Sequence, residues 1–331
     1  MLIIYVILFV MISRKKIKAI GLFSGGLDSV LATKLIIDQG VAVTALTFSS
    51  PLFSGKDKLI VRASAEQLGI PLHIIELKED YLKMIRAPKY GYGSAVNPCI
   101  DCRIFMLKKV KIFMEQAGAH FIFSGEVLGQ RPMSQYRHSL ELTARVSGLS
   151  DLLLRPLSAK LLSVTKPEKE GWIDREKLLG ISGRSRKEQL ALAREYKITT
   201  YSTPAGGCLL TEKKYAERLK DLWSYKKEIT LQEVSLLKIG RYFIFKKARI
   251  IVGRNQEENK ELLNLKSLND YFFTCPNFPS PTTLLIGDKT KENIQEAARL
   301  TARYSDAPGN KKIIVEYGCN ELDKKIEIET K

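Results

Sequence analysis

The residues best suited to phosphate chemistry form one short stretch, Ser-Gly-Gly-Leu-Asp-Ser at positions 24–29. An apolar run precedes it and a helical pattern follows it, which places the glycines at a helix N-terminus, where backbone N–H groups bind anions. Ser24 and Ser29 add hydroxyl donors. Asp28 would repel a phosphate, so its carboxylate is best explained by a Mg²⁺ ion between the two. The stretch lacks the lysine of the common loop G-x-x-x-x-G-K-[ST] and predicts a different phosphate-binding loop.

Cysteines form the second group of candidate residues. Cys99 and Cys102 are separated by two residues at the start of a predicted helix, and Arg103 adds positive charge. A helix N-terminus and a neighbouring cation favour the thiolate, so we expect these two thiols to be reactive. Cys208 lies in a Gly-Gly-Cys turn after a later β/α unit and can reach the same face. Cys275 and Cys319 stand alone and suggest structural thiols.

Three kinds of site are compatible with Cys99, Cys102 and Cys208. Three thiolates can hold a [4Fe-4S] cluster and leave one iron open for a sulfide. Alternatively, the thiols can form a redox pair with a persulfide carrier and act by thiol–disulfide exchange. A structural zinc site is the least favoured, because such sites are four-coordinate and no fourth ligand is evident. The three histidines of the chain are scattered, which excludes a histidine-rich metal centre.

Strand and helix patterns alternate around these residues and predict a doubly wound α/β domain with a parallel sheet. In such a sheet a ligand binds at the carboxyl ends of the strands, where the loop at 24–29 would lie. The expected strands cover residues 19–23, 41–49, 72–77, 120–124 and 152–157. The expected helices cover residues 30–39, 57–68, 104–117 and 182–196.

Beyond residue 211 the pattern changes to that of a smaller α+β domain. A charged amphipathic stretch at 212–233 predicts a connecting helix. Residues 238–254 hold six Lys or Arg and no acid, and they predict two strands with a turn at 246–247. Basic strands with interleaved aromatic residues indicate a nucleic-acid surface, although a charged outer face of a half-buried sheet is the alternative. The expected RNA-binding residues are Lys238, Arg241, Lys246, Lys247, Arg249 and Arg254.

The composition points to a polyanionic partner. The chain of 331 residues has 53 Lys and Arg against 36 Asp and Glu, which gives a formal net charge of +17. Five cysteines are too few for a disulfide framework and indicate a reducing, cytoplasmic compartment. The apolar N-terminal stretch is too short to span a bilayer, so no stable membrane association is expected. The expected divisions are an extension at 1–16, a nucleotide domain at 17–211, a linker helix at 212–233, a basic module at 234–322 and a charged tail at 323–331.

Four separated motifs resemble those of a known enzyme class. SGGLDS resembles the PP-loop of ATP pyrophosphatases, and together with GEVLGQRPMSQ (125–135) and LLRPLS (153–158) it is similar to the PP-loop domain of tRNA 4-thiouridine synthases. NPCIDC (97–102) is similar to the catalytic-cysteine segment of bacterial tRNA 2-thiouridylases. The resemblance covers about residues 17–211. It implies that ATP adenylates a uridine carbonyl oxygen of tRNA and that sulfur then displaces AMP.

This resemblance also implies roles for individual residues. Cys102 and Cys208 match the two cysteine positions used for sulfur transfer, and Cys99 completes the trio of cluster-dependent relatives. With Asp28 they are the expected catalytic residues. The expected partners are tRNA and a sulfur donor, with a homodimer as a further expectation. The residues expected to bind ATP, Mg²⁺ or the target base are Ser24, Gly25, Gly26, Asp28, Ser29, Gly125 and Gln130.

The chain also departs from the usual 4-thiouridine synthase. Its PP-loop is not preceded by a recognisable THUMP region, and no C-terminal rhodanese-like carrier is evident. Instead, residues 238–259 and YSDAPG (304–309) resemble the RNA-binding module of NFACT-type, ribosome-associated proteins. Two other functions stay open from the sequence: a PP-loop amidotransferase or ligase that uses nitrogen, and a non-catalytic RNA- or ribosome-binding factor.

Overall fold

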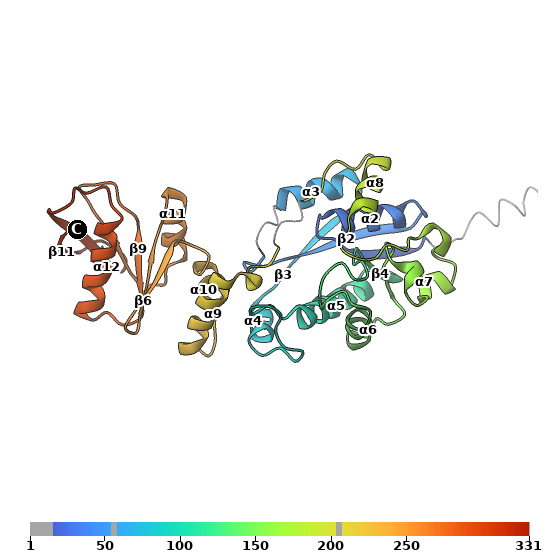
Figure 1. Cartoon of the computed structure of the whole chain (residues 1–331), viewed down its shortest axis with the longest axis horizontal. Helices are drawn as coiled ribbons and strands as arrows, with labels where there is room; N and C mark the ends of the chain where they lie inside the picture. Colours follow the sequence, from blue (N-terminus) through green and yellow to red (C-terminus); the bar gives the residue numbers. More distant parts are fainter. Residues whose placement is uncertain (1–15, 54–57, 203–206, 331) are drawn as a thin grey trace, which may run out of the picture. The chain divides into compact units, whose positions relative to one another are not determined.

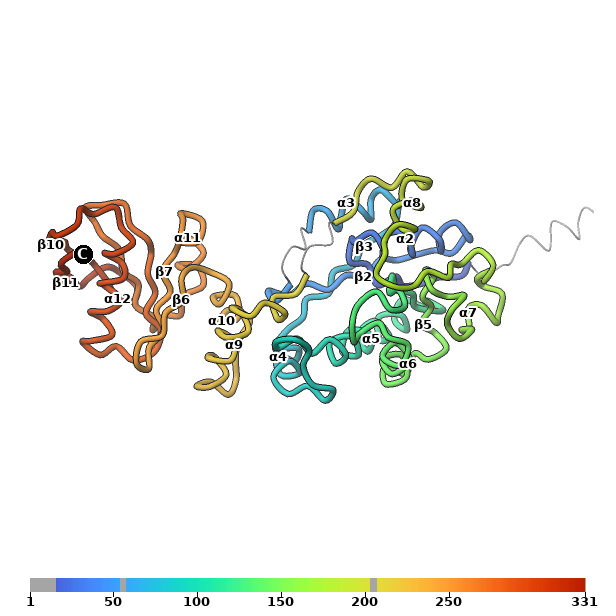
Figure 2. The backbone as a smooth tube through the Cα atoms, in the orientation of Figure 1, coloured from blue at the N-terminus to red at the C-terminus, as the bar shows by residue number. Residues whose placement is uncertain are grey.

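The computed structural model describes residues 16–53, 58–202 and 207–330. The chain divides between Glu212 and Lys213 into two compact units, which Figures 1 and 2 colour from blue to red along the sequence. The expected N-terminal extension lies almost wholly outside the described residues. Within those ranges, no helix combines the length and apolar character that crossing a membrane requires.

The first unit contains a five-stranded, wholly parallel sheet in the order β3-β2-β1-β4-β5. Helices cover both of its faces, with α2, α3 and α8 on one side and α4, α5 and α6 on the other (Figure 1). The α/β fold expected from the sequence is therefore confirmed. Its strands are β1 Lys18–Leu22, β2 Ala42–Ser49, β3 Leu72–Glu76, β4 Phe121–Ser124 and β5 Leu153–Leu154. Its α-helices are α2 Leu27–Ile37, α3 Lys58–Gln67, α4 Glu79–Arg86, α5 Cys99–Gln116, α6 Arg137–Val146, α7 Lys166–Lys169 and α8 Lys187–Glu195.

Helix α5 begins earlier than the sequence pattern predicts. Pro98 occupies its N-cap position, so Cys99 and Cys102 lie in the first helical turn, at the start of the helix as expected, although the helix begins before residue 104. Proline suits a helix start because its missing N–H has no helical partner there. Both thiols are therefore carried by regular backbone of α5.

The second unit is built on a six-stranded antiparallel sheet in the order β11-β10-β8-β9-β7-β6. Helix α12 packs on one face around Phe273 and Leu285, and helices α10 and α11 pack on the other around Ile251 and Leu284. The strands are β6 Arg241–Phe245, β7 Ala248–Val252, β8 Tyr271–Thr274, β9 Thr283–Ile286, β10 Lys312–Gly318 and β11 Lys324–Glu329. The helices are α9 Lys213–Tyr225, α10 Leu231–Leu236, α11 Gln256–Leu265 and α12 Lys291–Arg303.

Two expectations for this part of the chain differ from the structure. The stretch at 212–233 contains α9 and the start of a second helix, α10, because Thr230 caps α10 in a capping box. Its hydroxyl accepts from the Glu233 amide, and its own amide donates to the Glu233 carboxylate. The supposed charged tail forms strand β11, which pairs with β10 along its length. Ile326 and Ile328 alternate with charged residues and turn toward the core, which is the pattern of a half-buried edge strand.

A nearly buried ion pair joins helix α9 to strand β7. The guanidinium of Arg249 donates to both carboxylate oxygens of Asp221, at 2.8 and 2.6 Å, and the Tyr242 hydroxyl donates to the same carboxylate at 2.7 Å. Burial would raise the pKa of Asp221, but these hydrogen bonds hold it below its ordinary value. The pair fixes α9 against the sheet.

We predict that Asp221→Asn lowers the free energy of unfolding of the second unit by about 3 kcal/mol, because it leaves the Arg249 charge uncompensated in a largely buried site. Urea unfolding followed by hydrogen exchange of α9 and β7 peptides measures this change. The matched control is Glu327→Gln, which breaks an exposed pair with Lys312 and should cost at most about 0.5 kcal/mol. Equal effects of both substitutions would contradict the prediction.

Candidate functional site

The glycine loop is shaped by contacts with the end of the first unit. Gly25 has a φ of +71°, and a Cβ atom there would lie 2.9 Å from a Val61 methyl group, so only glycine fits. The Ser202 amide donates to the Gly25 carbonyl at 2.7 Å. Gly26 is the N-cap of α2 and no side chain caps the helix. The backbone amides of the first turn are therefore available to an anion, as the sequence predicts.

The two serines of the loop hold its conformation. The Ser29 hydroxyl donates to the Gly26 carbonyl at 2.8 Å and accepts from the Ser24 amide at 3.3 Å. Ser29 is buried, whereas Ser24 is exposed at the entrance of the loop. Ser24 thus remains the better placed of the two to meet a ligand.

Asp28 lies between two long polar side chains from distant parts of the chain. Its Oδ2 atom accepts from Gln130 Nε2 at 3.0 Å and from Arg186 Nη2 at 3.1 Å. Three buried atoms of this group, Asp28 Oδ1, Gln130 Oε1 and Arg186 Nε, have no hydrogen-bond partner among the described residues. Buried polar atoms are normally paired, so this trio indicates a missing ligand. Arg186 was not singled out from the sequence, where it is one of several basic residues of a predicted helix.

Gly125 brings strand β4 into contact with the start of α2. A Cβ atom at this position would lie 2.5 Å from the Ser29 amide nitrogen and 2.6–2.7 Å from the Asp28 carbonyl group. No larger residue fits without moving this backbone. The expected proximity of Gly125 to the glycine loop is thus a direct backbone contact.

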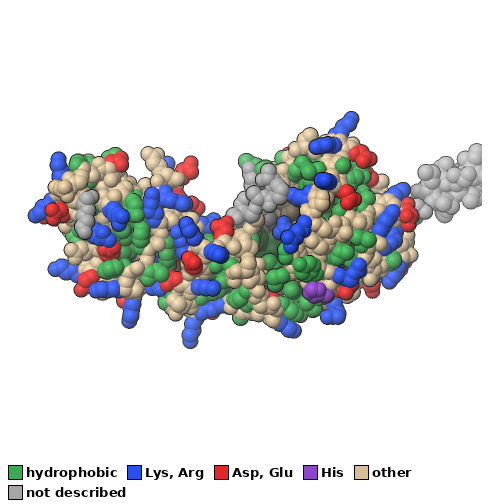
Figure 3. Space-filling view, in the orientation of Figure 1, with side chains coloured by type: hydrophobic (Ala, Val, Ile, Leu, Met, Phe, Trp, Pro, Cys, Tyr) green, Lys and Arg blue, Asp and Glu red, His purple; other side chains and the backbone are tan. Residues whose placement is uncertain are grey.

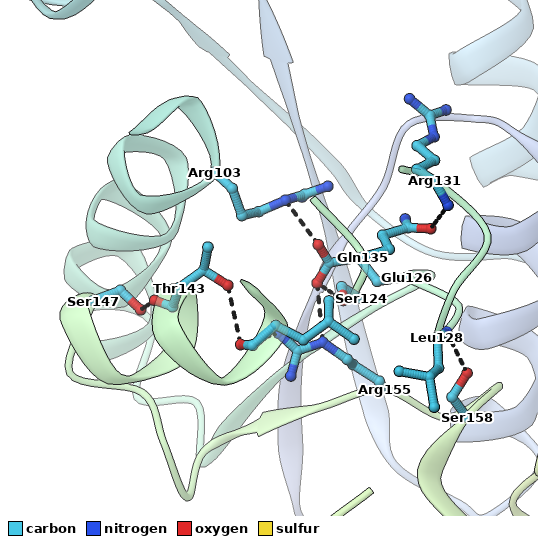
Figure 4. Close-up of polar contacts among 11 residues, drawn as sticks. Arg103, Ser124, Glu126, Leu128, Arg131, Gln135, Thr143, Ser147, Arg155 and Ser158 are labelled. Atoms are coloured by element: carbon cyan, nitrogen blue, oxygen red, sulfur yellow. Dashed lines mark hydrogen bonds and ion pairs between the residues drawn. The ribbon is translucent and has the colours of Figure 1, made fainter. Parts of the chain in front are cut away.

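Glu126, which follows β4 and Gly125, is bound to Arg103 of the cysteine helix α5 (Figure 4). Its side chain is 3% exposed, forms ion pairs with Arg103 at 3.0 Å and Arg155 at 3.1 Å, and accepts a hydrogen bond from Ser124 at 3.0 Å. Burial would raise the pKa of Glu126, but the two guanidinium groups hold it below its ordinary value. Arg103, expected from the sequence to act on the thiols, is instead committed to this carboxylate.

A hollow of about 90 Å³ lies beside the loop, at the carboxyl end of β2. Phe48, Phe53 and Ile74 supply apolar walls, and Val61, which contacts Gly25, lines it as well. Apolar walls with nearby backbone polar groups are typical of sites for flat ring systems. The sequence analysis did not anticipate these residues, because nothing in their spacing distinguishes them from ordinary core positions.

The three candidate cysteines lie near one another. The Tyr81 hydroxyl lies 3.0 Å from Cys102 Sγ, and the Asn97 amide donates to Cys99 Sγ at 3.2 Å. Burial raises the pKa of Tyr81 well above its ordinary value, and charge on Cys102, Cys208 and Cys99 raises it further. Tyr81 therefore keeps its proton and can donate to the Cys102 sulfur when that sulfur is a thiolate. Its buried ring is held against Phe53 and Phe105.

The surroundings of Cys208 favour its neutral thiol over the thiolate. Burial raises its pKa to about 12, and negative charge on Cys102 and Cys99 contributes to the shift. Within residues 16–53, 58–202 and 207–330, no set of three His, Cys, Asp or Glu side chains is placed to hold a metal ion. The three thiols are thus close enough to influence one another, but their arrangement does not fit the ligand set of a cluster.

The residue before Cys102 fixes the same helical turn. Asp101 is buried and accepts from the backbone amides of Lys89 and Tyr90, both at 2.9 Å. A carboxylate in the first turn of a helix is also favoured by the helix dipole. The loop before α5 is therefore tied to the cysteine turn itself.

The expected RNA-binding residues of the second unit have different surroundings. Arg249 is bound to Asp221, and Arg254 is paired with Glu258. Arg241 lies over the ring of Tyr304, its guanidinium carbon 4.5 Å from the ring centre. Lys238, Lys246 and Lys247 are exposed. Lys and Arg side chains are spread over the face seen in Figure 3.

Comparisons with known proteins agree with the motifs. Residues 15–167 match the family model described as thiamine biosynthesis protein (ThiI), and residues 240–331 match the NFACT protein RNA binding domain. Each match covers less than half of the chain, and the two matched regions correspond to the two resemblances found in the sequence.

Curated relatives are similar over part of their length. A probable tRNA sulfurtransferase of Staphylococcus aureus is 35% identical over 149 residues, which are 42% of this chain and 34% of that protein. The tRNA-specific 2-thiouridylase MnmA of Syntrophotalea carbinolica is 33% identical over 113 residues, which are 31% of this chain and 32% of that protein. The chain therefore spans about one third of the length of these relatives.

Two solved structures resemble part of the chain with low TM-scores. A 4-thiouridine synthetase in complex with RNA and ATP is 22% identical, with a TM-score of 0.39, over 67% of this chain and 51% of that chain. The U34-tRNA thiolase NcsA from Methanococcus maripaludis, which holds a [4Fe-4S] cluster, is 17% identical, with a TM-score of 0.35, over 68% of this chain and 71% of that chain.

We predict that Gly125→Ala weakens ATP binding by at least about tenfold, because the added methyl group displaces the first turn of α2. Isothermal titration with a non-hydrolysable ATP analogue measures the loss. Gly118→Ala is the matched control: Gly118 also precedes a strand region, and open space surrounds its Cβ position, although its φ of +60° adds some local strain. Similar ATP affinities of the two variants would contradict the prediction.

We predict that Tyr81→Phe moves the half-maximal pH of Cys102 alkylation upward by about one unit, because the thiolate loses a charge-assisted hydrogen bond. Iodoacetamide labelling across a pH series, read by peptide mass spectrometry, measures the shift. Cys208 is an internal reference, since a pKa of about 12 keeps its thiol neutral up to mildly alkaline pH. Tyr92→Phe, which removes a hydroxyl bonded to backbone carbonyls, should leave the profile unchanged. An unchanged profile for Tyr81→Phe would refute the role of Tyr81.

Proposed function

We propose that this protein is an ATP-dependent tRNA thiouridine synthetase. The observation that carries the proposal is the link between two reactive groups within one unit. Gly125 contacts the backbone of Asp28, and the next residue, Glu126, is bound to Arg103, the neighbour of Cys102. A nucleotide loop and a cysteine helix held together in this way suit a reaction that activates an atom with ATP and then replaces it with sulfur.

In the first step the uridine carbonyl oxygen attacks the α-phosphorus of ATP. An O–P bond forms, the bond between the α- and β-phosphates breaks, and pyrophosphate leaves. Backbone amides at the start of α2 stabilise the departing phosphates. Asp28 Oδ1, buried and unpaired among the described residues, suits a Mg²⁺ ligand, and the ion when bound would neutralise charge on the phosphates. Arg186 and Gln130 hold the other oxygen of Asp28 in place.

The hollow beside the loop is a suitable place for the nucleoside part of ATP. Phe48 and Phe53 give it apolar walls at the carboxyl end of β2. We assign this hollow to the adenine ring, since a purine buries well between apolar side chains next to a phosphate loop.

In the second step sulfur replaces AMP at the activated carbon. A persulfide on Cys208 attacks through its outer sulfur, the C–O bond breaks and AMP leaves. Cys102 then attacks the inner sulfur as a thiolate, which releases the thiouridine and leaves a Cys102–Cys208 disulfide. An external dithiol supplies the two electrons that restore the thiols. The hydrogen bond from Tyr81 favours Cys102 for the thiolate role, which leaves Cys208 as the carrier.

An iron–sulfur cluster is the other possible sulfur source for a trio of cysteines. The thiols as arranged do not fit its ligand set, so we route no step through a cluster. Cys99 distinguishes the two mechanisms, because a cluster needs it as a ligand and the relay described here does not.

Two kinds of observation support RNA as the substrate. The second unit matches an RNA-binding domain, and the net charge of +17 suits a polyanion. The relatives of the first unit carry the names of tRNA sulfurtransferase and tRNA-specific 2-thiouridylase. We infer that the substrate is tRNA.

We predict that Asp28→Ala and Cys102→Ser each reduce thiolation at least about 100-fold while tRNA affinity changes less than about twofold. The assay is anaerobic and contains bulk tRNA, Mg-ATP and a sulfur donor, and thionucleosides are read by mass spectrometry. Cys275→Ser, a buried thiol of the second unit, is the matched control and should stay active. Full activity of either variant would refute the mechanism.

The same assay is run with iron-reconstituted protein and sulfide, and with iron-free protein and a persulfide donor. The relay predicts product in the iron-free sample and retention of activity by Cys99→Ser. Product only with iron, together with loss of activity in Cys99→Ser, would replace the relay by a cluster mechanism. Absence of thionucleosides from both samples would reject the proposed function.

A further inference from the structure

A second hollow lies wholly within the second unit, whereas Cys99, Cys102 and Cys208 belong to the first unit. Its volume is about 430 Å³, and it is lined by the end of α9, the hairpin between β6 and β7 and the segment after β9. Nothing in the proposed chemistry uses these residues. The side chains that matter are Tyr225, Lys246, Lys247, Arg249 and Asp288.

An aromatic ring, that of Tyr225, lines this hollow and packs against Arg249, which lines it as well. The guanidinium carbon of Arg249 lies 3.9 Å from the centre of the Tyr225 ring, and Arg249 is itself fixed by Asp221. Tyr225 is nevertheless 42% exposed. Arg249 covers one face of the Tyr225 ring and fixes its position, and the exposed part of the ring offers a surface on which a planar group can stack.

Two lysines lie at the rim. Lys246 and Lys247 form the turn of the hairpin and are exposed, and no ion pair of the described ranges includes either of them. The pKa of Glu292 is lowered by a hydrogen bond from its own backbone amide and further by the nearby charge of Lys246. The Lys247 carbonyl accepts a hydrogen bond from Arg249 at 3.0 Å, which fixes the turn, and it passes close to Gly287. The two charges are therefore presented from a fixed turn beside the aromatic ring.

Asp288 gives the hollow a mixed character. Asp288 lines the same space as the lysines, and its negative charge disfavours a ligand that is only an anion. A carboxylate can, however, accept a hydrogen bond from the amino or imino group of a base. The combination of ring, cations and carboxylate matches the parts of one nucleotide: a base with donors and a phosphate.

We propose that this hollow is a subsite for a single-stranded nucleotide of the RNA, with the base stacked on Tyr225 and the adjacent phosphates bound by Lys246 and Lys247. The inference rests on the proposed function for the presence of RNA, and it deepens that proposal by locating where unpaired RNA is held. Arg249, expected from the sequence to contact RNA, acts here as a support for the ring.

The direct test is photocrosslinking of the full chain to a short single-stranded RNA that carries 5-iodouridine. We expect the crosslink at Tyr225, identified by peptide mass spectrometry, and its suppression by unlabelled single-stranded RNA. A crosslink confined to other aromatic residues would overturn the proposal. Suppression by AMP as strong as that by RNA would assign the hollow to free nucleotides and would also overturn it.

Binding of fluorescent oligouridine to variants of the full chain gives an independent test. Tyr225→Leu should weaken binding about tenfold with an unchanged salt slope, while Tyr225→Phe should bind like the parent chain. The double variant Lys246→Ala/Lys247→Ala should reduce the slope of log affinity against log salt by about 1.4, as expected for two lost phosphate contacts. The charge-matched control Lys311→Ala/Lys312→Ala should leave the slope unchanged.

Two results of this second test would overturn the subsite. One is parent-like affinity of Tyr225→Leu, and the other is an equal change of slope in the two double variants. A thermal unfolding curve for each variant separates lost binding from lost structure. Because the readout is RNA binding, a chain that thiolates tRNA normally but fails these tests disproves only the subsite, whereas a chain that passes them without thiolation disproves only the proposed function.

Discussion

The first unit depends on one buried carboxylate. Glu126 has almost no contact with solvent and is stable there only because Arg103, Arg155 and Ser124 bind both of its oxygens. A buried charge without such partners costs several kcal/mol, about 3–5 when one partner is removed. The arrangement therefore fixes the relative positions of the end of β4, the residue that follows β5, and the first turn of α5. Because these elements are fixed, the loop at 24–29 and the Cys102 thiol keep constant positions relative to each other.

The second unit uses its basic residues in two ways. Arg249 and Arg254 belong to a strongly basic stretch of sequence, yet both are engaged by carboxylates and contribute to structure. Lys246 and Lys247 come from the same stretch and remain exposed. A high net charge therefore indicates a polyanionic partner for the whole chain, but only the three-dimensional surroundings separate the residues that bind it from those that support them.

The sequence predicts the parts of this molecule that have local signals. Periodicity locates the parallel strands and the β6–β7 hairpin, and glycine spacing identifies the loop at 24–29. Strand β11 was missed because its two isoleucines are hidden among charged residues and need β10 as a partner. Arg186 and Tyr81 were missed because their roles come from contacts across 158 and 21 residues of chain. Such contacts depend on the tertiary fold and leave no pattern in spacing.

The first turn of α5 is anchored on both sides of Cys102. Asp101 is bonded to the backbone at residues 89–90, and Arg103 to Glu126. This turn can therefore neither rotate nor slide without breaking two buried sets of bonds. On the Cys102 side, a bond between Cys102 and Cys208 would therefore have to form without movement of the α5 backbone, by rotation of the Cys102 side chain alone. In the proposed relay Cys102 would thus be the stationary partner, and any larger adjustment would fall to Cys208 and its surroundings.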